Sequence, residues 1–228
     1  MAITTRVIII TIMTSPSLIQ LMTLLSPTFP VGGFAYSAGL EAARQNRWVN
    51  TADELESWIT TSLNYGTLHN DTVLLSATCQ KPGSVAEINQ LAISLCGSET
   101  RYLEATNLGN AFVAASTSWY TQSAPNLPDP IAYPVAVGAV STALTLPRID
   151  TLQAFLQSTI SNQIQIAIRL MSFGQRQAME LLHRFEPAIE TAAQDAQDAD
   201  LTQIGTSAIT MEIATLQHET LPSRIFRS

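Results

Sequence analysis

Charge is scarce in this sequence. Asp, Glu, Lys and Arg make up 13% of its 228 residues, about half of the roughly 25% that is typical of soluble domains. No charged residue occurs in residues 7–40, 105–128 or 130–147. Such stretches have to be buried in a core or against partner proteins, which favours a member of an obligate complex over a free monomer.

Cations are fewer than anions. The chain has 11 Lys and Arg against 18 Asp and Glu, a formal net charge of −7. Binding to nucleic acid needs clustered Lys and Arg to neutralise phosphates, so nucleic acid is excluded as the main partner.

Cysteine and histidine are also rare, with two and three residues respectively. Cys79 and Cys96 lack metal-ligand spacing and are interpreted as reduced core thiols, because a core of this size needs no disulfide to fold. No metal site and no cofactor is predicted. A transient metal contact at His218 is kept only as a minor alternative.

Strand patterns are nearly absent. The one strong β-branched run is residues 7–10, whereas almost every long later segment has helical periodicity. The sequence therefore predicts an all-α fold, a single-domain helical bundle of about eight to ten helices. Thr51 and Glu54 form a capping box for a helix expected to reach about Thr78. Asp150 is expected to cap a central core helix whose apolar stripe runs to Met171.

Two apolar segments imitate membrane signals. Residues 7–13 follow Arg6 as in a secretory signal, but no small-residue cleavage site follows cleanly. Residues 130–147 contain three prolines and are short for a membrane span, which favours a buried core helix. We expect a cytoplasmic protein without a membrane segment. Residues 1–16 are interpreted as disordered or extraneous, with Met13 preferred over Met1 as the native start.

The most distinctive stretch is residues 29–41, which has three glycines, a proline and no charge before Glu41. Glycine permits positive φ and close approach of another backbone, and proline fixes the entry of the chain. Ser37 is expected to cap the helix that follows. The segment is predicted to build a backbone shape and a contact surface.

These residues carry a resemblance to a known family. Residues 30–41 read Pro-Val-Gly-Gly-Phe-Ala-Tyr-Ser-Ala-Gly-Leu-Glu after a short leucine-rich helix at residues 18–25. This resembles the signature of the UreF family of urease accessory proteins. Residues 167–175, with Arg169 and the Gly174-Gln175 helix corner, and residues 218–228 are similar to two further family segments, although Ser172-Phe173 departs from the usual Pro-Leu.

The resemblance implies a function. UreF proteins are all-helical scaffolds and adaptors in nickel-dependent urease maturation, and they are not enzymes. The family implies a homodimer that binds UreD, also called UreH, and recruits and regulates the GTPase UreG. The assembly serves apo-urease, and GTP hydrolysis is coupled to nickel delivery. Residues 17–220 would form the UreF-like domain and residues 221–228 a partner-docking tail.

The tail is too short and polar to form a core element alone, so an ordered role requires docking. We expect Arg224 to pair with an aromatic such as Tyr36, and Phe226 to act as an apolar anchor. The tail is expected to fold onto the glycine-rich segment when a partner binds. The residues predicted to contact partners or shape this surface are Gly33, Tyr36, Gly39, Glu41, His218, Arg224, Phe226 and Arg227.

Two other classes of function are weighed against this one. Residues 35–39 differ by one residue from a Gly-x-Ser-x-Gly nucleophile elbow, which would make Ser37 the nucleophile of a hydrolase with His218 or His183 as base. An elbow needs a strand before it, and no strand series is predicted. A membrane-associated helical protein is the second alternative, because of the uncharged stretches.

Overall fold

The structure, a computed structural model, describes residues 15–120 and 124–228. The predicted extraneous segment therefore lies outside the described residues except for its last two positions, as does the choice between Met1 and Met13. Helix α1 begins at Ser15.

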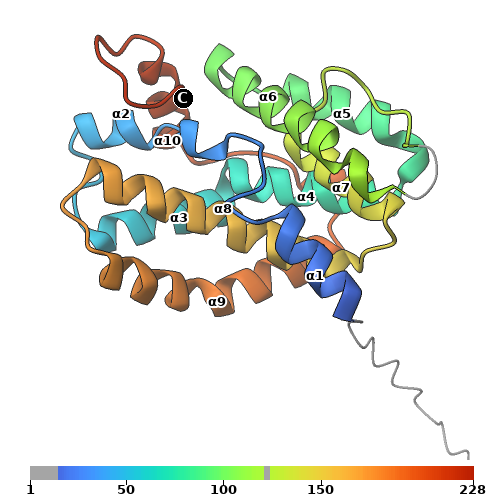
Figure 1. Cartoon of the computed structure of the whole chain (residues 1–228). Coiled ribbons are helices and arrows are strands. Elements are labelled where there is room, and N and C mark those ends of the chain that lie inside the picture. Colours follow the sequence, from blue (N-terminus) through green and yellow to red (C-terminus); the bar gives the residue numbers. More distant parts are fainter. Residues whose placement is uncertain (1–14, 121–123) are drawn as a thin grey trace, which may run out of the picture.

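The all-α prediction is confirmed, since the described ranges contain helices and no strand. The α-helices of the bundle (Figure 1) are α1 (Ser15–Leu24), α2 (Leu40–Gln45), α3 (Ala52–Tyr65), α4 (Thr67–Gln80), α5 (Val85–Ser94), α6 (Glu99–Ser116), α7 (Tyr133–Ala143), α8 (Arg148–Leu170), α9 (Gln175–Gln197) and α10 (Ile209–His218).

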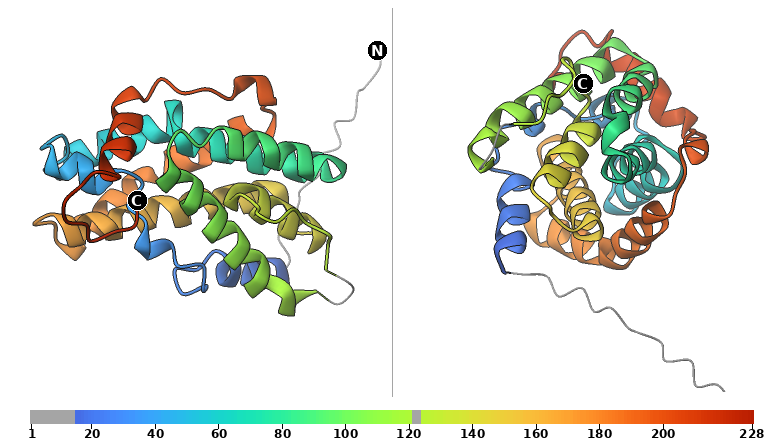
Figure 2. Two further views of the ribbon diagram at one scale, coloured as in Figure 1. Left: turned by 90° about the horizontal axis from the view of Figure 1, so that it is seen from above. Right: turned by 90° about the vertical axis from the view of Figure 1, so that its right-hand side faces the viewer.

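Helices α4 and α7 form the buried centre of the bundle. Residues 72–78 of α4 and residues 134–141 of α7 are all buried, so the expected core helix within residues 130–147 is confirmed. The long helices α8 and α9 pack against each other, and α8 also contacts α4 and α7. Figure 2 shows this arrangement along the bundle and from one end.

Two glycines let the central helices approach closely. A Cβ atom at Gly109 of α6 would overlap the carbonyl oxygen of Ile131, just before α7. A Cβ atom at Gly138 of α7 would lie 2.8 Å from Cβ of Thr78 on α4. Real Cβ atoms do not make contacts this short. Glycine at these two positions therefore lets α6 approach the start of α7, and α7 approach α4.

The predicted helix from residue 51 to about Thr78 is wrong in its length. Its start is confirmed by the capping box of Thr51 and Glu54, but α3 ends at Tyr65 and α4 begins at Thr67. Gly66 separates them with extended backbone, and a Cβ atom there would lie 3.1 Å from Cβ of Ala208.

The next correction concerns the start of α8. Pro147 occupies its N-cap position, and Asp150 lies inside the first turn instead of capping it. Proline fixes φ near the helical value but blocks the preceding residue from helical backbone, which accounts for a start three residues earlier than expected.

The C-terminal tail meets the glycine-rich segment. In Figures 1 and 2 the tail, coloured dark red, lies beside α2 and the blue segment that precedes it. The backbone N–H of Arg227 donates to the carbonyl oxygen of Ala35 at 2.7 Å. The fold therefore brings together the two segments that the sequence marked as distinctive.

Candidate functional site: the tail joint

The site is the contact between residues 35–41 and residues 223–228, which we call the tail joint. The carbonyl oxygen of Ser228 accepts hydrogen bonds from the N–H of Ser37, at 2.8 Å, and from its hydroxyl. The N–H of Ala38 donates to Oγ of Ser228 at 3.3 Å. Consecutive donors of the glycine-rich segment therefore hold one residue of the tail.

Left-handed backbone shapes this set of donors. Ala38 has φ of 51° and Gly39 has φ of 81°, and such conformations can turn successive N–H groups toward one acceptor. A Cβ atom at Gly39 would also lie 3.0 Å from Oγ1 of Thr215 on α10. Gly39 thus meets two demands, positive φ and close contact with α10.

The expected cap of α2 is corrected in its position. Gly39 occupies the N-cap position and has no side chain to offer. Oγ of Ser37, two residues earlier, accepts the N–H of Glu41 at 3.3 Å. The hydroxyl is therefore used by the helix start, although not as an N-cap.

The carboxylate of Glu41 binds the backbone of the tail. Its Oε1 accepts the N–H of Ile225 at 2.7 Å, and its Oε2 accepts the N–H of Phe226 at 3.1 Å. Nε2 of His218, at the end of α10, lies 2.9 Å from the same Oε2. Glu41 is 2% exposed and His218 is fully buried, with no hydrogen-bond partner for Nδ1 among the described residues.

An aromatic contact closes the joint. The Phe226 ring is buried, and Cζ of Arg169, from the end of α8, lies 4.5 Å from its centroid. Arg169 also donates to the carbonyl oxygen of Phe34 at 3.2 Å. A guanidinium does stack on an aromatic here, but the expected pair of Arg224 and Tyr36 is wrong.

Tyr36 and Arg224 have different environments. Tyr36 is buried, and its hydroxyl accepts a hydrogen bond from Nδ2 of Asn107 at 3.1 Å. Arg224 is exposed on the tail. The guanidinium that lies over an aromatic ring at the joint is that of Arg169 on Phe226, so Arg169 takes the role that was assigned to Arg224.

Buried charges support the joint from α6 and α4. Oγ of Ser228 donates to Glu104, which lies 3.6 Å from Arg101, and Arg101 lies 2.6 Å from Asp71. Burial raises the pKa of both carboxyls, and the nearby Arg101 guanidinium offsets this only in part. Burial alone would lower the pKa of Arg101, but the two carboxylates raise it overall.

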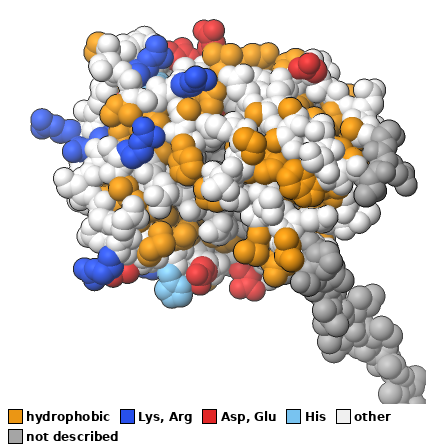
Figure 3. Space-filling model, viewed as in Figure 1, with side chains coloured by type: hydrophobic (Ala, Val, Ile, Leu, Met, Phe, Trp, Pro, Cys, Tyr) orange, Lys and Arg blue, Asp and Glu red, His pale blue; other side chains and the backbone are white. Residues whose placement is uncertain are grey.

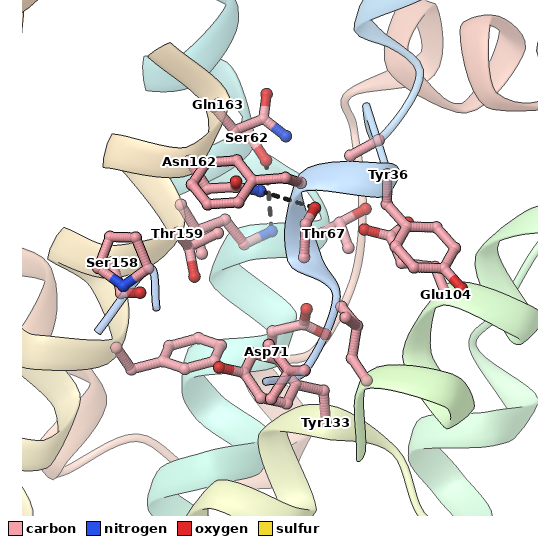
Figure 4. Close-up of a pocket in the computed structure, with 18 of the residues that line it drawn as sticks. Tyr36, Ser62, Thr67, Asp71, Glu104, Tyr133, Ser158, Thr159, Asn162 and Gln163 are labelled. Carbon is pink, nitrogen blue, oxygen red and sulfur yellow. Dashed lines mark hydrogen bonds between the residues drawn. The ribbon is translucent and has the colours of Figure 1, made fainter. Parts of the chain in front are cut away.

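A cavity of about 120 Å³ lies under the glycine-rich segment. Figure 4 shows that segment crossing the cavity, with Asn162 and Thr159 of α8 on one side and Glu104 on the other. Nδ2 of Asn162 donates to the carbonyl oxygen of Gly33 at 3.2 Å. Arg101 lies between the two carboxylates of this cavity, which disfavours a bound cation there.

The side chains of the described ranges do not assemble into a metal site. They contain no group of three or more His, Cys, Asp or Glu side chains that could hold an ion. His183 pairs with Glu186 at 3.0 Å, exposed on α9 and without a third ligand. Burial raises the pKa of both Cys79 and Cys96, which fits their interpretation as packed thiols.

The hydrolase alternative fails on geometry. Ser37 is buried, its hydroxyl donates to Ser228, and its proposed base His218 is bound to Glu41. No strand precedes it in the described chain, so the elbow context is missing. No described helix combines the length and apolarity that a membrane span requires.

The structure brings most of the predicted residues together at the tail joint, but in different environments. Gly39, Glu41, His218 and Phe226 form the interior of the tail joint, whereas Arg224 and Arg227 are exposed on it. Gly33 lies over the cavity and Tyr36 is buried beside α6. Direct partner contact by these residues stays a prediction.

Several residues of the joint were missed. Arg169 lay in a recognised segment but was interpreted as part of a structural corner, and nothing connected Ser228 with Ser37. The spacing of three between Arg101 and Glu104 was the only local sign of the buried charges, and Asp71 had none. Sequence separation hides such contacts because only the fold brings them together.

Fold and site together define a class of protein. It is an all-helical protein whose distinctive feature is a C-terminal tail docked onto residues 35–41 through polar contacts.

Comparison with known proteins identifies the family. The family model described as UreF matches residues 49–186. The chain is 42% identical over 215 residues to the urease accessory protein UreF of Rhizobium meliloti (strain 1021), and 41% identical over 215 residues to that of Rhizobium etli (strain CIAT 652), in each case with 93% of this chain and 96% of the relative covered. The chain belongs to the UreF family, whose members are urease accessory proteins.

Proposed function

We propose that this chain acts in urease maturation as a scaffold and adaptor, with the tail joint as a partner-docking surface. Family membership supports the role in maturation. UreD, also called UreH, is the proposed direct partner, and the GTPase UreG and apo-urease join the assembly. The chain would work in the cytoplasm as a homodimer.

The observation that carries this proposal is the alternation of the tail. Phe226 and Ser228 point into the protein and are buried, whereas Arg224, Ile225 and Arg227 are exposed. Inward residues fix the tail, and outward residues form a surface that has no function in the chain's own core. Arginine flanking an apolar side chain is a composition common in the centres of interfaces.

The docked tail corrects the expected order of events, in which the tail folds onto the glycine-rich segment only when a partner binds. Tail contacts with the glycine-rich segment exist in the single chain, without any partner present. Docking before binding lowers the entropy cost of association, because the tail is already ordered. Partner binding would therefore use a preformed surface.

The proposed mechanism is differential binding. An adaptor that prefers one conformation of the GTPase shifts its population toward that conformation and releases it after hydrolysis. Such a role needs contact surfaces and no nucleophile, which agrees with the buried, hydrogen-bonded state of Ser37.

Co-purification tests the proposal. The full chain and a variant truncated after Leu221 are each mixed with matched UreD and UreG and separated by size. We expect a ternary complex with the full chain and none with the truncated variant. Circular dichroism of the truncated variant serves as the control for folding. Retention of the complex by a folded truncated chain would contradict the proposal.

A further inference from the structure

Exposed arginines gather around the tail joint. Arg47 at the end of α2, Arg169 at the end of α8, and Arg224 and Arg227 on the tail are all exposed. We call these four residues the arginine surface. Figure 3 shows Lys and Arg side chains gathered at the end of the molecule where α2 and the tail lie, while carboxylates on this face lie toward its upper and lower edges.

These arginines have no carboxylate partners among the described residues, unlike several others. Arg101 pairs with Asp71, Arg176 with Glu180 and Arg184 with Glu56, but the salt bridges of the described chain include none of the arginine surface. Glu41 lies directly under the tail, yet it is buried and its oxygens are already bound. Cations are thus concentrated and uncompensated in a chain of net charge −7.

Arg47 adds a second observation, which concerns its backbone. Its φ is 61°, a left-handed conformation that glycine or asparagine adopts more easily. An arginine at this position is unfavourable for the backbone, and its side chain makes no hydrogen bond within the described residues. Strained residues of this kind occur preferentially at functional surfaces.

Apolar side chains lie among the arginines. Ile225 is 62% exposed between Arg224 and Phe226, and Phe34 is 41% exposed beside the Arg169 contact. A phosphate backbone offers no apolar surface for such side chains to pack against, and the overall negative charge of the chain would repel nucleic acid. A protein surface can satisfy both features at once, with carboxylates for the arginines and a pocket for Ile225.

We propose that the arginine surface binds an acidic protein surface that has an apolar pocket for Ile225. This inference rests on the proposed function and adds the chemistry of the partner to it. Opposite charges on two surfaces accelerate the encounter and fix the relative orientation, whereas the apolar anchor slows dissociation. Charge determines the association rate constant here, and Ile225 the dissociation rate constant.

The test measures binding kinetics with matched UreD as the immobilised probe, over salt concentrations from about 50 to 500 mM. The variant R224E/R227E reverses the charge on the tail. R176E is the matched control, because Arg176 is 86% exposed at the start of α9, is paired with Glu180 and is not part of the arginine surface. We expect R224E/R227E to lower the association rate constant at least tenfold at low salt and R176E less than twofold.

A second variant, outside the tail, controls for the possibility that R224E/R227E acts by undocking the tail. R47G removes one charge at a position where glycine fits the backbone better, so its fold and tail should be retained. We expect a two- to threefold lower association rate constant and a weaker salt dependence. Reversal of an acidic residue of UreD to Arg should restore binding to R224E/R227E, which only direct charge pairing explains.

The outcomes separate this inference from the proposed function. If truncation after Leu221 abolishes binding while R224E/R227E and R47G leave the rate constants and salt dependence unchanged, the acidic partner is refuted and the docking surface stands. If the truncated chain still binds, the proposed function fails. Binding of a single-stranded DNA probe at about 150 mM salt, lost in R224E/R227E, would also overturn the inference in favour of nucleic acid.

Discussion

The central core and the tail joint are held together by different kinds of interaction. Helices α4, α6 and α7 meet through apolar side chains and two glycines that allow backbone contact. The tail itself buries one aromatic ring, that of Phe226, and relies on hydrogen bonds to Glu41, Ser37 and Ala35. Apolar packing is cooperative across the bundle, whereas polar contacts at one edge can break locally. The comparison indicates a stable body with a separately adjustable surface.

The largest effect is expected in the core. Gly109→Ala places a Cβ atom on the carbonyl oxygen of Ile131, and the backbones must separate to admit it. We expect the free energy of unfolding, measured by urea denaturation, to fall by about 3 kcal/mol or more. Gly83→Ala is the control, because nothing lies within 4 Å of its added Cβ. Equal stability of the two variants would refute the close packing of α6 against α7.

A large but local effect is expected at the joint. Glu41→Ala leaves the N–H groups of Ile225 and Phe226 and the His218 ring without their acceptor, at about 1–3 kcal/mol for each group left buried. Undocking of the tail limits this cost. We expect hydrogen exchange of the tail amides to accelerate about 100-fold while α4 and α7 amides keep their protection.

A surface carboxylate provides the control for Glu41. Glu56 pairs with Arg184 at the surface, where such pairs contribute about 0–1 kcal/mol. Glu56→Ala should leave the tail amides protected. If Glu41→Ala instead lowered protection throughout the bundle, the tail joint would be part of the core and the comparison would be wrong.

A pH effect is expected from Glu104, whose folded pKa is raised by burial. Such a carboxyl binds its proton more tightly in the folded state than in the unfolded state. Its contribution to stability is therefore complete below the unfolded pKa of about 4.3, and it is lost as the pH rises through the folded pKa. Glu104→Gln should reduce the fall in unfolding free energy between about pH 4 and 7. An unchanged pH profile from urea denaturation would contradict this.

The smallest effect is expected at Arg169. Arg169→Leu keeps an apolar side chain over Phe226 but removes the cation and the hydrogen bond to Phe34. We expect tail amides to lose about 0.5–1 kcal/mol of protection. Arg169→Lys should recover only part of it, because an ammonium group cannot stack as a planar guanidinium does. Full recovery would assign the effect to charge alone.

The sequence predicted the helical class and both halves of the joint, because these depend on local patterns. Periodicity over 3.6 residues identified most helices, and unusual composition marked residues 29–41 and the tail. The boundary at Gly66 was missed, since α4 is buried on nearly all sides and has no apolar stripe to distinguish it. A helix without a stripe offers no periodic signal of where it begins.

Contacts within the joint were less predictable. Glu41 was selected from a motif, but nothing in the sequence showed that it binds the backbone of Ile225 and Phe226, 184 and 185 residues away. The guanidinium over Phe226 was assigned to the wrong arginine because the end of α8 reaches the joint only in the folded bundle. Long-range polar contacts leave no spacing rule in a sequence.

The sequence separation of 191 between Ser37 and Ser228 has a consequence for synthesis. Ribosomes release the chain from its N-terminus, so the glycine-rich segment emerges early and waits for residue 228 before its donors are bound. Closing so long a loop is slow relative to local helix formation. The tail joint is therefore expected to form after the local helices, so that the helical body is in place before the tail docks onto it.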